Sequence, residues 1–379
     1  MTVLFATHPA YARHDTGPGH PERPERLQAV LDGATGAGLG EALVDLVPRP
    51  ATRNELYRVH PPRFVEKIEV LCASGGGYID GDTVTVPESW EAALLAAGAG
   101  VTAVEALDRG DAGATSAFCA VRPPGHHARM AQAMGFCLFN NVAVTAAALA
   151  ERGERVLVVD YDVHHGTGTQ DIFYGDPRVL YVSFHEWPLY PGTGALDELG
   201  AGEAVGATVN FPLPAGATGD VLRAGVDEVL APIVDRWRPT WVLVSAGFDG
   251  HRDDPLAGLS LAAGDYADLT AELLAFAPPG RRIVFLEGGY DLGALARSTT
   301  ACLGAMAGVD LRPEPATAGG PGRTVVRAVA EVRERAADRG GPWAIVGEYP
   351  GITDESAGVD RAGSVASDGP DGSDGSDEG

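Results

Sequence analysis

The sequence has few cysteines and almost no lysine. Lys67 is the only lysine in 379 residues, so nearly all of the 28 basic residues are arginine. The cysteines stand far apart and form no Cys-x-x-Cys pair, which argues against a disulfide framework. We expect four reduced, mostly buried thiols in a cytoplasmic protein: Cys72, Cys119, Cys137 and Cys302.

Long apolar runs are also missing. No stretch of about eighteen consecutive apolar residues occurs, so we expect no transmembrane helix. Residues 1–8 lack a basic region followed by a long apolar stretch, so we expect no secretory signal. A hydrophobic content of 45% is nevertheless sufficient for a large globular core.

Positive charge is scarce relative to negative charge. The formal net charge is −24, and a surface this acidic repels phosphate, which argues against direct binding to nucleic acid. Such a surface would attract cationic substrates. The sequence leaves the oligomeric state open.

Strands and helices alternate from about residue 115 onwards. This alternation predicts an α/β fold with a single parallel sheet flanked by helices on both faces. Ligands of such sheets bind at the carboxyl ends of the strands. Predicted helices include 55–71, 89–107, 142–152, 220–237, 262–275 and 292–307, and 75–82 is predicted as loop. Predicted strands cover 3–8, 117–121, 156–160, 179–184, 208–213, 241–245 and 283–286.

The chain changes character after about residue 310. A Pro/Gly/Ala-rich linker is followed by the alternating charges of a short amphipathic helix at 324–339. Beyond residue 352 Asp, Gly and Ser predominate, and such a composition cannot form a packed core. We predict a catalytic domain over 1–310, a linker with an amphipathic helix over 311–351, and an acidic disordered tail over 352–379.

Metal-capable side chains follow the predicted strand 156–160. Asp160, Asp162 and His164 occupy every second position, and in an extended chain such side chains point the same way. Asp249 follows another predicted strand and could complete a set with Asp162 and His164. Catalytic zinc is commonly held by three protein ligands and a water, and two carboxylates would also suit Fe²⁺, Mn²⁺ or Co²⁺.

Further polar and aromatic side chains follow other predicted strands. His126 and His127 lie on a Pro/Gly-fixed loop and are suited to proton transfer beside a metal. Tyr290 follows two glycines and could direct its hydroxyl at a developing oxyanion. Phe136 and Tyr190 are loop aromatics that could line a substrate channel. Together these groups favour a metal site with a substrate channel at this edge of the sheet.

The motifs resemble those of the zinc-dependent histone deacetylase superfamily, which includes acetylpolyamine amidohydrolases and acetoin-utilisation proteins. The resemblance covers about residues 1 to 310 and is closer to the class II-like branch. The motifs, in family order, are His-Pro-Glu-Arg-Pro-Glu-Arg (20–26), Arg-Pro-Pro-Gly-His-His (122–127), Gly-Phe-Cys-Leu-Phe-Asn-Asn (135–141), Asp-Tyr-Asp-Val-His-His-Gly (160–166), Pro-Gly-Thr-Gly (191–194), Ser-Ala-Gly-Phe-Asp (245–249) and Glu-Gly-Gly-Tyr (287–290).

This resemblance implies an arginase-like fold and a role for each matching residue. Zinc would be held by Asp162, His164 and Asp249. His127 would act as general base and then general acid, while His126, oriented by Asp160, would help electrostatically. 

The resemblance also implies a channel and a second cation. Tyr290 would stabilise the oxyanion, Phe136 and Tyr190 would sandwich an acyl-lysine stem, and Leu256 would lie near the channel mouth. A structural K⁺ would be bound by a group of side chains and carbonyls from Asp160, Asp162, His164, Ser183 and Phe184.

One position departs from the family. The residue that supports the second histidine is usually Asp or Asn, and here it is Thr167. A hydroxyl can accept a hydrogen bond but carries no charge, so we expect a lower pKa for His127. Supporting residues of this kind change activity or metal affinity by about 10–100-fold.

The leading hypothesis is removal of acetyl groups from N-acetyl-lysine side chains of proteins. An alternative is hydrolysis of small acetylated amines such as acetylpolyamines, which would need a carboxylate near the mouth, for example Glu22 or another loop carboxylate. Leu256 favours an uncharged acyl-lysine. A third hypothesis, favoured only by Thr167, is a catalytically weak binding protein with the deacetylase fold.

Overall fold

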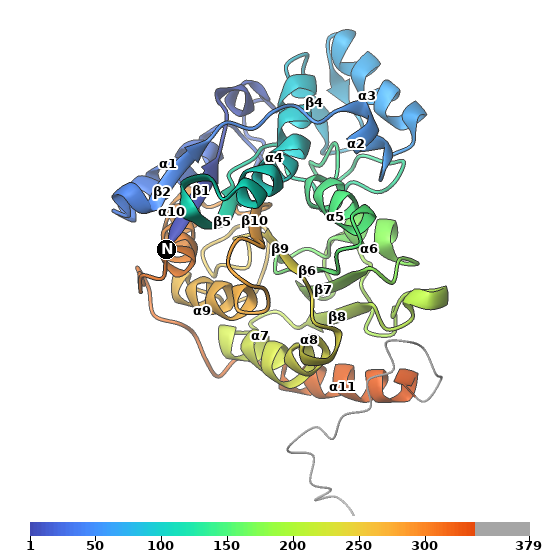
Figure 1. Ribbon diagram of the computed structural model, residues 1–379, viewed down its shortest axis with the longest axis vertical. Coiled ribbons are helices and arrows are strands. Elements are labelled where there is room, and N and C mark those ends of the chain that lie inside the picture. Colours follow the sequence, from blue (N-terminus) through green and yellow to red (C-terminus); the bar gives the residue numbers. More distant parts are fainter. Residues whose placement is uncertain (338–379) are drawn as a thin grey trace, which may run out of the picture. The chain divides into compact units, whose positions relative to one another are not determined.

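The structure, a computed structural model, describes residues 1–337, and all of these belong to one compact unit. Figure 1 shows helices on both sides of a central sheet. The predicted acidic tail at 352–379 lies outside the described residues, as does the end of the predicted linker and helix segment.

The central sheet of the described residues has eight strands, all parallel. Their order is β2-β1-β5-β10-β9-β6-β7-β8, which confirms the predicted fold class. The strands are β1 Thr2–Ala6, β2 Leu43–Leu46, β5 Ala114–Cys119, β6 Val156–Asp160, β7 Val179–Glu186, β8 Thr208–Leu213, β9 Trp241–Ala246 and β10 Arg282–Leu286.

The central strands are apolar because helices cover both faces. Every residue of β6 is buried, as expected for a parallel strand without a solvent face. Helices α4 and α5 pack on one face, against β5, β10, β6 and β9, and helices α1, α10, α9 and α7 form the layer on the other (Figure 1).

The helices mostly begin and end near the predicted bounds. α10 coincides with the predicted range, whereas the predicted helix 220–237 is interrupted by the π-helical segment η5. The α-helices are α1 Glu25–Gly36, α2 Arg53–Tyr57, α3 Pro62–Ala73, α4 Ser89–Arg109, α5 Asn141–Glu151, α6 Thr167–Phe173, α7 Gly219–Gly225, α8 Ala231–Trp237, α9 Ala263–Leu274, α10 Leu292–Ala307 and α11 Arg323–Ala337; short helical turns are η1 Pro9–Arg13, η2 Gly40–Ala42, η3 Asp111–Gly113, η4 Gly202–Ala204 and η5 Val226–Leu230.

Two local predictions near the N-terminus were wrong. The predicted helix 55–71 is two helices, because Pro61 and Pro62 end α2 and begin α3. Proline favours the first helical positions and disrupts a helix interior. The predicted loop 75–82 contains the first strand of a short antiparallel hairpin, β3 Gly77–Tyr78 paired with β4 Val84–Thr85.

Helix α4 is the one helix of the described residues that is long and apolar enough to cross a membrane, although the sequence lacks a continuous apolar run of that length. Most of it is buried inside the protein, 78% of its most apolar window, and it contacts β5 and α5. This is the environment of a core helix.

Helix α11 packs against β8 and α7, and Val326 and Val329 are buried. The predicted amphipathic helix therefore covers the edge of the sheet beyond β8. The predicted domain boundary at residue 310 stays a prediction.

Candidate active site and metal centre

Four of the predicted motifs meet at one edge of the sheet. They follow β5, β10, β9 and β6, which are consecutive strands at the centre of the sheet. Because these strands are parallel, their carboxyl ends lie side by side, where α/β proteins bind ligands. Residues that are far apart in the sequence are thereby brought into one site.

Asp162, His164 and Asp249 converge as predicted. One ligand atom from each lies within 4.8 Å of the others. Nδ1 of His164 is 3.2 Å from Oδ1 of Asp162 and 3.1 Å from Oδ2 of Asp249. The two carboxylates are held from behind by backbone donors, Gly288 N–H to Asp162 Oδ2 at 2.8 Å and Val163 N–H to Asp249 Oδ1 at 3.0 Å.

The charges of this donor set suit a cation. Asp162 and Asp249 are fully buried, so their mutual repulsion is poorly screened. Burial disfavours a proton on His164, but the hydrogen bonds that its ring can donate to the two carboxylates outweigh burial and raise the pKa of His164 to about 10. Two carboxylates and one imidazole are ordinary ligands for zinc and related divalent ions, and the residues present therefore fit a metal.

A small residue is required behind the carboxylates. A Cβ at Gly288 would overlap Oδ2 of Asp249 and approach Oδ2 of Asp162. We expect Gly288→Ala to displace both carboxylates and weaken metal affinity by about 10–100-fold, measured by competition with a chelator. Gly175→Ala is the control, because a Cβ there meets no atom within 4 Å. Equal affinities in the two variants would contradict this account.

His126 is held by two carboxylates. Its Nδ1 is 3.0 Å from Oδ2 of Asp160, and its backbone N–H donates to Oε2 of Glu287 at 3.1 Å. Burial opposes a charge on His126, but Asp162 and Asp160 outweigh burial and raise its pKa well above the ordinary value. His126 is thus placed to carry positive charge.

His127 has the opposite environment. Burial lowers its pKa well below the ordinary value, and the neighbouring His126 and His164 lower it further. Its Nδ1 is buried without a hydrogen-bond partner among the described residues, so the hydroxyl of buried Thr167 does not accept from it. The sequence predicted a low pKa for His127 because of Thr167. In the structure, burial and the neighbouring imidazoles are the causes of that low pKa.

A cavity of about 260 Å³ leads to these groups. His127, His164 and Tyr290 line it, together with the three predicted channel residues Phe136, Tyr190 and Leu256. The rings of Tyr190 and His127 meet edge to face at 5.2 Å between centroids, and those of Phe136 and Tyr290 at 5.8 Å. The lining also includes Asp82, which the sequence analysis did not single out.

Tyr290 is fixed by its backbone and its ring. Its N–H donates to Oδ2 of Asp254 at 2.6 Å, and the guanidinium of Arg26 lies 4.9 Å from the centre of its ring. Burial raises the pKa of Tyr290 well above the ordinary value. Its hydroxyl is therefore a hydrogen-bond donor at neutral pH.

Comparison with known proteins identifies this arrangement. The sequence profile of the histone deacetylase domain matches residues 20–306. The chain belongs to the histone deacetylase family. It is 40% identical over 318 residues to a probable deacetylase of Archaeoglobus fulgidus, and the aligned region spans 82% of this chain and 88% of that protein. It is 38% identical over 282 residues to a histone deacetylase-like amidohydrolase of Pseudomonas aeruginosa, spanning 72% of this chain and 73% of that protein.

The fold agrees with that of a solved structure of the same family. The crystal structure of the HDA15 HD domain superposes with a TM-score of 0.81 at 34% identity, covering 88% of this chain and 95% of that one. Family and fold together make this protein a hydrolase of the deacetylase and amidohydrolase kind. Members of the histone deacetylase family are generally metal-dependent, and Asp162, His164 and Asp249 form a group that could hold a metal ion here.

A buried ionic network, which the sequence did not predict, supports the loops of this deacetylase-family site. Glu22 accepts from Arg122 at 2.5 and 2.8 Å and from Arg26 at 3.0 Å, and none of the three is exposed. Arg26 also donates to the carbonyls of Glu287 and Gly289 at 2.6 Å each. The network ties residues 20–26 to the loops that carry His126 and Tyr290.

This network rules out one predicted role. Glu22 is fully buried between two guanidiniums and therefore cannot be a carboxylate at the channel mouth. Asp82 occupies that region, as part of the cavity lining. The spacing of Glu22 and Arg26, which suits a helical ion pair, was the only sequence signal of the network.

The residues assigned to K⁺ lie behind the metal site. Asp160 and Ser183 are register partners of β6 and β7, and both are fully buried, as is Phe184. Oδ1 of Asp160 accepts from the N–H of Asp162 at 3.1 Å, and the hydroxyl of Ser183 shares a hydrogen bond of 2.9 Å with Nδ1 of His185. The K⁺ site stays a prediction.

Proposed function

We propose that this protein removes acetyl groups from N-acetyl-lysine side chains of cytoplasmic proteins, with Zn²⁺ held by Asp162, His164 and Asp249. The observation that carries the proposal is the channel, which is lined by Phe136 and Tyr190 together with His127, His164 and Tyr290. Two aromatic walls suit the uncharged methylene stem of an acyl-lysine. Leu256 at the lining keeps the wall apolar.

The residues divide the chemistry among themselves. The bound metal would polarise the amide carbonyl and lower the pKa of a water. Neutral His127 takes the proton from that water and then protonates the leaving amine. His126 is paired with Asp160, and its positive charge stabilises the negative charge that develops during the reaction. The hydroxyl of Tyr290 donates to the amide oxygen as charge accumulates on it.

Tyr290→Phe tests the donor role. Because loss of one oxyanion donor costs about 10²–10³-fold in kcat, we expect that reduction on an acetyl-lysine peptide, with little change in KM. Stopped assays of kcat and KM measure it, and Tyr57→Phe on α2 is the control. A kcat equal to that of the parent protein would exclude the role of Tyr290.

A second candidate function is hydrolysis of small acetylated amines. Asp82 in the channel lining favours it, because a carboxylate there could hold a distant ammonium group. Burial and the neighbouring Asp80 raise the pKa of Asp82. Because Phe136, Tyr190 and Leu256 give the channel an apolar wall, we expect acetyl-lysine peptides to have a higher kcat/KM than acetylpolyamines in a direct comparison. A preference for acetylpolyamines that Asp82→Asn abolishes would instead support the second function.

A further inference from the structure

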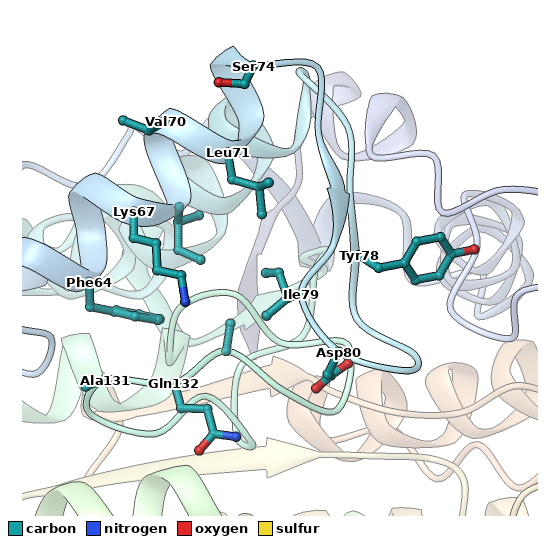
Figure 2. A pocket seen from close by; sticks show the side chains of 12 residues that line it. Phe64, Lys67, Val70, Leu71, Ser74, Tyr78, Ile79, Asp80, Ala131 and Gln132 are labelled. Atoms are coloured by element: carbon teal, nitrogen blue, oxygen red, sulfur yellow. The ribbon is translucent and has the colours of Figure 1, made fainter.

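A second cavity, of about 650 Å³, lies beside the active-site channel. It opens between helix α3, the segment 78–80 that begins at β3, and the loop 131–133. Figure 2 shows Phe64, Lys67 and Leu71 of α3 facing Ile79 and Gln132 across this space. A volume of this size is typical of ligand sites in proteins.

Two segments of the chain contribute neighbouring residues to both cavities. Asp80 lines the second cavity while Asp82, two residues further along the same turn, lines the channel. Likewise Ala133 lines the second cavity, and Gly135 and Phe136 line the channel. The turn is stiffened by Oδ1 of Asp80, which accepts from the N–H of Thr83 at 2.7 Å. A molecule that leaves the channel across this turn therefore meets the second cavity.

Apolar side chains and one cation mark this surface. Val70 is 62% exposed and Tyr78 73% exposed, both at the second cavity, and Met130, beside its loop, is 51% exposed. Val70 and Tyr78 lie on opposite sides of the cavity (Figure 2), and exposed apolar side chains around a cavity indicate an interaction surface. Lys67 forms no ion pair among the described residues, in a chain of net charge −24, and its ammonium group points into the cavity in Figure 2.

We propose that the second cavity binds a neighbouring segment of the acetylated polypeptide whose acetyl-lysine occupies the channel. The segment that fits has apolar side chains against α3 and one acidic side chain paired with Lys67. This inference rests on the proposed function and adds a sequence preference to it. A free acetylated amine is confined to the channel, so only a polypeptide gains from the second cavity.

Reversal of the charge of Lys67 tests the ionic contact. Two acetyl-lysine peptides, differing only in an acidic or a basic residue a few positions from the acetyl-lysine, are compared with a monomeric acetyl-lysine amide. We expect the parent protein to favour the acidic peptide by a lower KM, and Lys67→Glu to favour the basic one. Each preference is about fivefold, the effect of a single modest contact. The same preference in both proteins would overturn the ionic contact.

Two further variants test the apolar contact. Val70→Asp and the filling variant Ala131→Trp should each raise the KM for an apolar peptide about fivefold, with kcat and the monomeric amide unaffected. Val47→Asp is the matched control, a similarly exposed valine (72%) that does not line this cavity. An unchanged peptide KM in both variants would overturn the proposal, as would an equal loss with the monomeric amide.

The same measurements distinguish failure of the proposed function from failure of this inference. If the parent protein hydrolyses neither the peptides nor the monomeric amide when loaded with metal, the deacetylase proposal fails and this inference falls with it. If the parent protein hydrolyses the peptides and the monomeric amide, but the variants change the KM of neither or of both equally, only the proposal for the second cavity fails.

Discussion

Asp249→Asn should abolish metal binding and lower the turnover of an acetyl-lysine peptide about a thousandfold. The variant keeps the shape of the side chain and its contact with Val163 N–H but removes one of two ligand charges. A metal supplies several kcal/mol of stabilisation to a polarised carbonyl, and each 1.4 kcal/mol is about tenfold in rate. Metal content per chain and steady-state kinetics measure the two effects.

Thermal unfolding gives a second readout for Asp249→Asn. Added Zn²⁺ should raise the unfolding temperature of the parent protein, because a ligand that binds only the folded state stabilises it, but not that of the variant. In chelator the variant should be the more stable, because burial and the nearby Asp162 both disfavour charge on Asp249. Asp253→Asn, a half-exposed acid on the same loop, is the control. Full metal content in Asp249→Asn would contradict the assigned ligand set.

Glu22→Gln should lower the free energy of unfolding by about 3–5 kcal/mol at neutral pH, the usual effect of breaking a buried ion pair. It leaves Arg26 and Arg122 buried without their counter-charge. Urea unfolding measures the loss. Because Arg26 also contacts the ring of Tyr290, we expect kcat to fall as well. Glu91→Gln, in a half-exposed pair with Arg13, should cost at most about 1 kcal/mol.

The stability difference between Glu22→Gln and the parent should depend on pH. Burial would raise the pKa of Glu22, but Arg122 and Arg26 outweigh burial and lower it from 4.5 to about 2. A depressed pKa stabilises the folded state above the unfolded value and loses that effect as the pH falls through the folded value. The difference should therefore be constant above about pH 5 and narrow below it. A constant difference down to pH 3 would contradict this charge assignment.

The group that could hold a metal could be predicted because its geometry is local. Asp162 and His164 are two positions apart just after a buried strand, and a parallel sheet brings Asp249 to the same edge. β6 and β9 could be predicted as strands from their apolar runs alone. The order of the strands, in contrast, depends on packing between distant segments.

The residues that support the site could not be predicted for the same reason. Glu22 and Arg122 are 100 positions apart, and a carboxylate in a loop of Pro and Arg is normally solvated. Nδ1 of His127 has no hydrogen-bond partner among the described residues. This depends on the orientation of side chains, which a motif does not specify. The error at 55–71 was avoidable, because Pro61 and Pro62 exclude a continuous helix there.

The position of β10 has a consequence for biosynthesis. It is the last strand along the chain but lies between β5 and β9, so until Leu286 has left the ribosome the sheet exists only as two separate halves. One half carries Asp162, His164 and Asp249, and the other carries the loop of His126 and His127 after β5. Large proteins fold partly during synthesis. A nascent chain can thus bring Asp162, His164 and Asp249 together early, but His126 and His127 come to lie beside them only when the final strand is inserted.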